Sequence, residues 1–241
     1  MNKQLFSVYK RWCKHRLNKA LPGIVDELAG YAQQSDTTGT KWTTLWWAVH
    51  TILTYKPKVI LECGTGASTI VFAAAIQKLH AQDATYQGRI ISMESVAAWR
   101  DIAVSNLPEK YKEDVEIILG EREPYQIAFF RGYCHSNIPQ LDYEFVFLDG
   151  PNYDDDRGTS FCGDILKVLE WSERRFIRAV VDTRVSSVFV LQTLFGTRAV
   201  RYYPFIKTCA LRLPKRKLTE KITTRDFSSN LFGRIRLKKF E

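Results

Sequence analysis

The sequence predicts an α/β fold with a seven-stranded, mostly parallel sheet, helices on both faces and a C-terminal antiparallel hairpin. From residue 57 onward, apolar β-rich runs alternate with helix-like segments of about ten to fifteen residues, a pattern typical of βαβ units. The last two β-rich runs, 198–205 and 208–213, are too close together for a crossover helix. They can pair as a hairpin that closes the sheet.

The predicted elements follow one another without an internal repeat. The parallel strands are expected at residues 58–63, 88–95, 114–121, 143–150 and 177–183. Helices are expected between them at 67–80, 96–107, roughly 123–136, 160–173 and 185–196, and before them at 3–21, 21–33 and 42–55. Residues 1–56 are therefore predicted to form an N-terminal helical extension or cap, 57–215 the sheet domain, and 216–241 a basic C-terminal tail.

Composition favours a soluble, cytoplasmic protein. At 241 residues and 45% hydrophobic content, the chain is long enough for one sizeable core. The apolar stretch 45–53 is too short to span a bilayer, and basic residues interrupt any signal-peptide core near the N-terminus. The five cysteines are scattered, odd in number and contain no C-x-x-C pair, which suits a reducing compartment better than a disulfide framework or a zinc site.

Positive charge is concentrated at the two ends of the chain. Residues 1–20 hold six Lys/Arg and no acid, and residues 201–241 hold twelve Lys/Arg against three acids, so the middle of the chain is net acidic. Residues 3–21 are predicted to form a basic amphipathic helix. This helix could lie peripherally on an anionic membrane surface, pack on the domain, or contact a second subunit in a homo-oligomer, and the basic ends could also simply be solvated.

Acidic residues end all five predicted parallel strands, three of them close to a glycine. The strand-end residues are Glu62 with Gly64 and Gly66, Glu94, Gly120 with Glu121, Asp149 with Gly150, and Asp182. In an open parallel sheet, ligands bind outside the carboxyl ends of the strands, where the strand order reverses. Individual strand-end acids often cap helices or lie in solvated turns, but five at one edge favour a ligand site.

The turn after the first strand favours a cationic nucleoside over a dinucleotide. Its sequence, GTGAST at residues 64–69, lacks the third glycine of the G-x-G-x-x-G pattern, and Glu62 would repel a nearby pyrophosphate. S-adenosylmethionine carries an ammonium, a sulfonium, a ribose and an adenine, but no phosphate. The residues around this turn therefore predict S-adenosylmethionine rather than NAD as the cofactor.

Four segments resemble, in order, the motifs of class I S-adenosylmethionine-dependent methyltransferases, which have a Rossmann-like fold. The segments are ILECGTGAST (60–69), GRIISMES (88–95), VEIILGE (115–121) and FVFLDGP (145–151). The first motif is similar to the variant that has Ser-Thr in place of the third glycine. With the closing hairpin, the resemblance covers residues 57–213 and points to the branch similar to small-molecule O-methyltransferases.

The resemblance implies a role for each matching position. Glu62, Gly64, Thr65 and Gly66, with Ser68 beside them, would hold the methionine end of the cofactor. Glu94 would bind the ribose, and Met93 and Ser95 would lie beside the nucleoside. Gly120 and Glu121 would lie at the adenine, and Asp149 near the transferred methyl group.

Metal dependence stays open at this point. Asp149 and Asp182 fall where related O-methyltransferases have ligands for a divalent metal such as Mg²⁺, but Thr183 replaces the asparagine of that pattern. An oxygen acceptor needs a base or a metal to lower its pKa. Asp149, Tyr153 and His135 are the candidates for catalytic residues, although for His135 a role as a hydrogen-bonded structural histidine is favoured over a catalytic one.

The acceptor is expected to be a small molecule or a glycan, methylated at oxygen. A nucleic-acid methyltransferase is an alternative, since DGPNY (149–153) approaches the Asp-Pro-Pro-Tyr motif of enzymes acting on DNA bases and the C-terminal tail is basic. The extra residue in that motif and the lack of interleaved aromatic residues in the tail argue against it. A third hypothesis is a non-catalytic, methyltransferase-like binding module, and a fourth is an NAD-linked reductase, which Glu62 and the missing glycine disfavour.

Overall fold

The computed structural model of the chain describes residues 3–34, 41–151, 154–155, 158–182, 184–206 and 208–214. Its α-helices are α1 (Lys3–Ala20), α2 (Ile24–Gln34), α3 (Trp42–Tyr55), α4 (Ala67–Gln82), α5 (Ala97–Asn106), α6 (Asp164–Trp171) and α7 (Val185–Phe195), with a short 3₁₀ helix η1 at Glu109–Tyr111. Its strands are β1 (Val59–Cys63), β2 (Arg89–Glu94), β3 (Val115–Leu119), β4 (Arg122–Ile127), β5 (Phe130–His135), β6 (Phe145–Leu148), β7 (Asp154–Asp155), β8 (Gly158–Thr159), β9 (Phe161–Cys162), β10 (Phe176–Asp182), β11 (Val200–Tyr203) and β12 (Thr208–Pro214).

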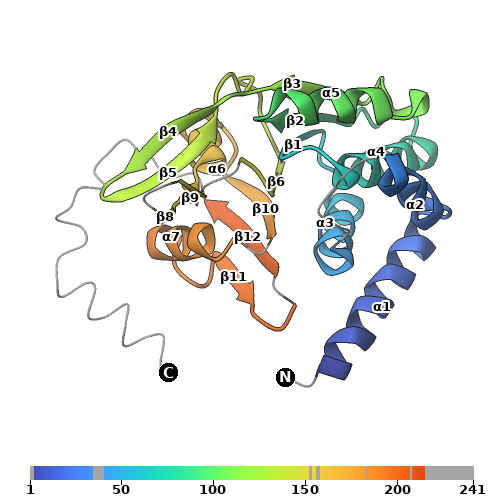
Figure 1. Cartoon of the computed structure of the whole chain (residues 1–241), viewed down its shortest axis with the longest axis horizontal. Coiled ribbons are helices and arrows are strands. Elements are labelled where there is room, and N and C mark those ends of the chain that lie inside the picture. The colour runs from blue at the N-terminus through green and yellow to red at the C-terminus, as the bar shows by residue number, and fades with distance from the viewer. Residues whose placement is uncertain are drawn as a thin grey trace.

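A seven-stranded sheet forms the centre of the molecule, in the order β11-β12-β10-β6-β1-β2-β3 (Figure 1). The five strands from β10 to β3 are parallel to one another. The strand order reverses between β1 and β6, because the chain moves outward from β1 to β2 and β3 before returning to β6 on the other side. The predicted Rossmann-like fold is therefore confirmed, and its switch point lies at the carboxyl ends of β1 and β6.

The C-terminal hairpin closes the sheet as predicted. β12 pairs antiparallel with β10 and with β11, so it lies between them although β11 precedes it in the sequence. In this register Asp182 of β10 faces Thr208, and Thr208 faces Tyr203. The hairpin thereby extends the row of residues at the carboxyl edge of the sheet beyond Asp182.

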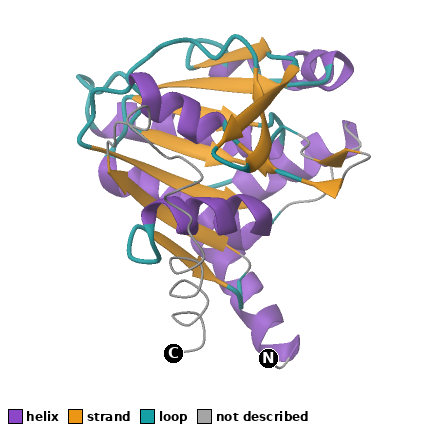
Figure 2. Ribbon diagram, turned by 90° about the vertical axis from the view of Figure 1, so that its left-hand side faces the viewer, coloured by secondary structure: helices purple, strands orange, loops and turns teal. Residues whose placement is uncertain are grey.

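Two hydrophobic cores lie on the two faces of the central sheet, and Figure 2 shows helices on both sides of its strands. One core joins α1, α2, α3 and α4 to the sheet and includes Phe72, Phe145 and Phe147. The other joins α6, α7 and a small sheet to the opposite face. The strands are almost continuously apolar because both faces are covered; β6, for example, is buried at all four positions.

The helix predicted at roughly 123–136 is wrong: these residues form the β4–β5 hairpin. The burial of β4 and β5 alternates with a period of two, as expected for strands, and Ala128 at the turn has a positive φ of 52°. β5 also pairs with β9, which gives a three-stranded sheet in the order β4-β5-β9. A helix was expected here because helices separate the other parallel strands, whereas the high aromatic content of 123–136 is typical of strands.

Two further differences concern boundaries and the N-terminus. The helix predicted at 160–173 begins only at Asp164, since Phe161 and Cys162 belong to β9. The helices before the first strand form as predicted, and α1 leaves the body of the molecule toward its N-terminal end (Figure 1). None of the helices in the described part of the chain combines the length and apolar character that crossing a bilayer requires. The tail at 216–241 lies outside the described residues.

Candidate functional site at the sheet switch point

The turns after β1 and β6 touch each other through their backbones. A Cβ atom at Gly64 would lie 2.9 Å from the backbone nitrogen of Gly150 and 3.0 Å from the carbonyl carbon of Asp149. Gly64 also has a φ of +96°, which favours glycine. A backbone hydrogen bond from Asp149 N to Cys63 O joins the two turns, and one from Gly64 N to Met93 O joins the first turn to β2; both are 2.8 Å long.

Glu62 is a completely buried carboxylate at the end of β1. Its Oε2 accepts hydrogen bonds from Thr69 Oγ1 at 2.5 Å and from Ser92 Oγ at 2.6 Å, but its Oε1 is buried without a hydrogen-bond partner. Burial raises the pKa of Glu62 to about 7, although Ser68, Ser92 and Thr69 act to lower it. A cationic group that reached Oε1 would therefore be bound strongly, because it would supply the missing partner and favour the ionised form.

The start of α4 presents an open backbone beside this carboxylate. Gly66 N donates to Thr69 Oγ1 at 3.0 Å, and Thr65 Oγ1 lies 3.2 Å from the same oxygen. A Cβ atom added at Gly66 would meet no protein atom within 4 Å. Gly66 is thus a position where a ligand could approach the backbone, in contrast to the tightly packed Gly64.

Glu94 ends β2 in a fixed orientation. Its Oε1 accepts the backbone N–H groups of Ser95 at 2.7 Å and Val96 at 2.9 Å, and the side chain is 5% exposed. Because one oxygen is occupied by these donors, the carboxylate is held at the strand end without the help of a ligand. This geometry suits an acceptor for the two hydroxyl groups of a ribose.

The remaining predicted cofactor residues lie along the same edge, next to Glu94. Gly120 N donates to Glu94 O at 2.9 Å, and a Cβ atom at Gly120 would lie 2.6 Å from Met93 Cε. Met93 is fully buried, Ser95 is half-buried and Glu121 is exposed. The structure thus brings together every predicted cofactor residue on neighbouring turns of β1, β2, β3 and β6.

A polar cluster of two carboxylates and two cations lies at the ends of β6 and β10. Asp182 is 1% exposed, pairs with Lys41 Nζ, and accepts a hydrogen bond from Thr44 Oγ1 at 2.9 Å. Arg184 lies near Asp149, with 3.6 Å between Nη2 and Oδ1, and donates to Pro151 O at 2.9 Å. The pKa of Asp149 is raised overall by desolvation and by the neighbouring Asp182, although its side chain is 43% exposed and Arg184 and Lys41 act to lower the pKa.

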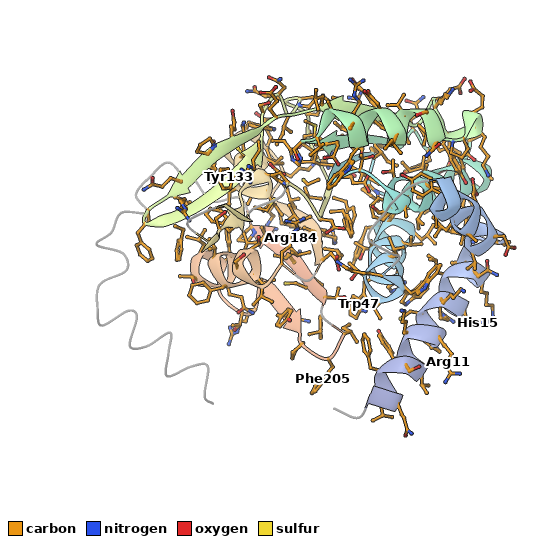
Figure 3. All side chains as sticks on the ribbon, viewed as in Figure 1. Arg11, His15, Trp47, Tyr133, Arg184 and Phe205 are labelled. Carbon is orange, nitrogen blue, oxygen red and sulfur yellow. The ribbon has the colours of Figure 1, made fainter. Side chains whose placement is uncertain are left out.

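Sequence reasoning missed the two cations of this cluster. Lys41 directly precedes α3, and Arg184 directly precedes α7, so both lie at the same edge of the sheet as Asp182 (Figure 3 labels Arg184). The sequence could have pointed to Lys41 and Arg184 through their positions directly before predicted helices. Because Lys41 and Arg184 already compensate the two carboxylates, the arrangement does not favour the divalent metal predicted at Asp149 and Asp182.

His135, one of the predicted catalytic residues, lies away from solvent. It ends β5 with 0% exposure, and its Nδ1 is 2.7 Å from Oδ2 of the equally buried Asp164. Burial raises the pKa of Asp164, but the charge and hydrogen bonds of His135 outweigh this and lower it overall. His135 has no access to an acceptor in this geometry. Tyr153, another predicted catalytic residue, lies outside the described residues.

An aromatic group from the N-terminal helices borders the hairpin end of the site. Trp47 of α3, labelled in Figure 3, lies against Tyr203 of β11 with ring centroids 5.1 Å apart, and its Nε1 donates to Tyr9 Oη at 3.1 Å. Thr43 and Thr44, on the preceding turn of α3, contact Ile206 O and Thr208 Oγ1. The described N-terminal helices therefore form one side of the carboxyl edge near Asp182.

Comparisons with known proteins give matches only among solved structures; no protein-family model and no curated protein matches the chain. A protein of Listeria monocytogenes described as a class I S-adenosylmethionine-dependent methyltransferase matches with a TM-score of 0.47 and 12% identity, over 85% of this chain and 70% of that one. An S-adenosylmethionine-dependent methyltransferase of Aquifex aeolicus matches with a TM-score of 0.39 and 11% identity, over 70% and 89%. A protein of Nostoc punctiforme described as an O-methyltransferase matches with a TM-score of 0.33 and 12% identity, over 68% and 50%. These likenesses concern the fold.

Proposed function

We propose that this chain is an S-adenosylmethionine-dependent methyltransferase. The observation that carries the proposal is Glu62, a buried carboxylate at the switch point with one unpartnered oxygen. It stands beside a glycine with open space and one strand away from the fixed carboxylate of Glu94. A ligand that brings a cation to Glu62 and a diol to Glu94, without phosphate, fits this charge distribution. A dinucleotide would place a pyrophosphate near Glu62.

Different residues at the carboxyl edge of the sheet would bind different parts of the cofactor. Glu62, with Gly64, Thr65, Gly66 and Ser68 around it, would hold the amino-acid end of the cofactor. The ribose would contact Glu94, and Met93 and Ser95 would lie beside the nucleoside. The adenine would lie near Gly120 and Glu121. When bound, the cofactor supplies an electrophilic methyl group on a sulfonium.

For the transfer step, the chain has to align the acceptor and remove its proton. Asp149 lies at the switch point, and its raised pKa suits a residue that accepts a proton from a hydroxyl group. Lys41 and Arg184 hold the carboxylate pair of Asp149 and Asp182 in place by charge. We therefore favour an oxygen acceptor on a small molecule or a glycan, deprotonated by Asp149, with Tyr153 as a further candidate.

Calorimetric titration of the purified chain with S-adenosylmethionine, S-adenosylhomocysteine and NAD tests the proposal. The expected result is micromolar binding of the first two and no binding of NAD, since only NAD carries a pyrophosphate. Binding of NAD alone would replace the proposal with an NAD-linked enzyme. Binding without transfer to any acceptor in a broad screen would favour the non-catalytic module.

Cofactor affinity is expected to depend on pH through Glu62, whose pKa lies at about 7. A cationic ligand binds the ionised carboxylate, so affinity should rise with pH up to about 7 and then level off. Below that pH it should fall by up to about tenfold per unit. At pH 7, binding should release about half a proton, which titrations in buffers of different ionisation enthalpy measure.

Glu62→Gln is the matched variant for this pH effect. It should bind more weakly and lose both the pH dependence and the proton release. The wild-type affinity should be measured from about one and a half pH units below the pKa of Glu62 to half a unit above it. A constant affinity over that range would contradict the assignment of the cation to Glu62.

We also propose that α1 brings the enzyme to anionic membrane surfaces. Leu5 and Val8 are 64% and 54% exposed, Trp12 is 46% exposed, and all three share one side of a helix that has basic residues but no acid. Figure 3 shows Arg11 and His15 on the part of α1 that extends from the body. Exposed apolar side chains next to positive charge are typical of helices that lie at lipid interfaces.

Vesicle sedimentation distinguishes this role of α1 from a subunit contact. The full chain should sediment with vesicles rich in phosphatidylserine and not with phosphatidylcholine alone. Leu5→Ser/Val8→Ser should reduce the bound fraction by roughly tenfold. Val104→Ser, which alters an exposed apolar residue on α5, should leave it unchanged. Loss of a dimer rather than of vesicle binding would instead identify α1 as a subunit contact.

The nucleic-acid hypothesis rests on the basic tail, which lies outside the described residues. A competition between anionic vesicles and double-stranded DNA or RNA of equal charge decides between the two polyanions. Tighter, salt-dependent binding of nucleic acid would revive that hypothesis.

A further inference from the structure

Four ionisable side chains meet beneath the glycine turn, on the face of the sheet opposite Glu62. Cys63 ends β1, His135 ends β5, Cys162 lies in β9, and Asp164 is the first residue of α6. All four side chains have 0% exposure. None of them has a part in the cofactor binding or proton transfer proposed above, so their convergence in the core needs a separate explanation.

The side chains converge on Asp164. His135 Nδ1 lies 2.7 Å from Asp164 Oδ2, and the backbone N–H of His135 donates to Oδ1 at 2.7 Å. Cys162 Sγ lies 3.4 Å from the same Oδ2. The potential ligand atoms of Cys63, His135 and Asp164 all lie within 4.8 Å of one another. Within the described residues, this is the one group of three or more His, Cys, Asp or Glu side chains that converges in this way.

Without a metal ion, the hydrogen-bonding capacity of this group is incompletely satisfied. The second ring nitrogen of His135, Nε2, is buried without a hydrogen-bond partner. The thiol of Cys162 is a weak S–H donor, shared between Gly150 O at 2.8 Å and Asp164 Oδ2 at 3.4 Å. Buried polar groups are normally fully paired, and unpaired ones are destabilising.

The donor types indicate which ion would complete the group. Thiolate sulfur and imidazole nitrogen are preferred ligands of zinc, whereas Mg²⁺ and Ca²⁺ require mainly oxygen ligands. Structural zinc sites have four protein ligands and no open position, which agrees with the complete burial of these four side chains. Three of the donors already lie within 4.8 Å of one another, and Cys162 Sγ would have to leave Gly150 O to become the fourth ligand.

We propose that Cys63, Cys162, His135 and Asp164 form a closed, structural zinc site. On binding, the two thiols release their protons to solvent, and the ion is held by two thiolates, the carboxylate and one imidazole nitrogen, without any change of redox state. Cys63 directly precedes Gly64, whereas the hydrogen bond that the Cys162 thiol donates to Gly150 O at 2.8 Å would be lost with its proton. The ion would therefore fasten the turn after β1 to the small sheet and α6.

The test uses the full chain without an affinity tag. After purification, removal of metal and reconstitution with ZnSO₄, elemental analysis should find about one zinc per chain. Reconstitution with Co²⁺ should give a thiolate-to-cobalt charge-transfer band and the intense visible bands of a tetrahedral site. Addition of a chelator should lower the melting temperature by several degrees.

Two double variants separate this site from other thiols. Cys63→Ala/Cys162→Ala should lose the zinc and the charge-transfer band. Cys13→Ala/Cys209→Ala, which removes two equally buried cysteines from other parts of the core, should keep both. If the first variant does not fold, the cobalt spectrum of the wild-type chain still tests whether the zinc site exists. A reconstituted wild-type chain with less than about one tenth of an equivalent of zinc and no charge-transfer band would overturn the proposal, as would equal zinc in both variants.

Discussion

Glu94→Ala is expected to weaken binding of S-adenosylmethionine about one hundred-fold. The carboxylate would otherwise accept charge-assisted hydrogen bonds from the two ribose hydroxyls, and losing them costs about 3 kcal/mol. The effect is large because the carboxylate is already held in position by the N–H groups of Ser95 and Val96, so little ordering is needed on binding. Calorimetry or competition with a fluorescent analogue measures the change.

Two further variants locate the cause of that loss. Glu94→Gln keeps an acceptor oxygen for Ser95 and Val96 but removes the charge, and it should lose about tenfold. Glu116→Ala replaces an exposed glutamate on the neighbouring strand β3 and should bind as the wild type does. Unchanged affinity in Glu94→Ala would mean that the ribose lies elsewhere.

The second large effect is expected at Gly64. Gly64→Ala should lower the free energy of unfolding by about 3 kcal/mol, because the new Cβ would lie within 3.0 Å of the Gly150 and Asp149 backbones at a φ of +96°. These contacts are backbone atoms, which cannot swing aside as a side chain can. Urea denaturation followed by circular dichroism measures the loss.

Gly66→Ala is the matched control for this prediction, two residues away in the same turn. Its Cβ would meet no protein atom within 4 Å, so stability should stay within about 0.5 kcal/mol of the wild type. Cofactor affinity should nevertheless fall at least tenfold, because the methyl group would occupy the space through which the ligand approaches the backbone. If Gly66→Ala bound normally, the cofactor would not lie against α4.

Many of the residues at the carboxyl edge of the sheet could be placed there from sequence, because local signals position them. Each of Glu62, Glu94, Gly120 and Asp149 directly follows or ends an apolar run that reads as a strand. Once five such strands are parallel, their carboxyl ends must lie at one edge of the sheet. The hairpin was predictable for the same reason, since the short gap between its strands allows only an antiparallel turn.

The sequence-based predictions were wrong or incomplete where the structure depends on contacts between segments distant in the sequence. The β4–β5 hairpin was expected to be a helix because a parallel sheet usually continues with one, yet the chain instead pairs β5 with β9. This pairing carries His135 into the core, where a helix would have left it near the edge. Lys41 and Thr44 were missed because Asp182, which they meet in the structure, lies 141 and 138 residues away in the sequence.

The sequence by itself determined the fold class and the row of acidic residues at the carboxyl edge of the sheet, since these depend on hydrophobic periodicity and on residues adjacent to strand ends. Only the tertiary structure decided the surroundings of those charges: the unpartnered oxygen of Glu62, the cations beside Asp149 and Asp182, and the group formed by Cys63, His135 and Asp164, with Cys162 next to Asp164. The cysteine spacing argued against a zinc site, because such spacing detects ligands from one loop. Here the four ligands come from four elements, and only long-range strand pairing brings them together.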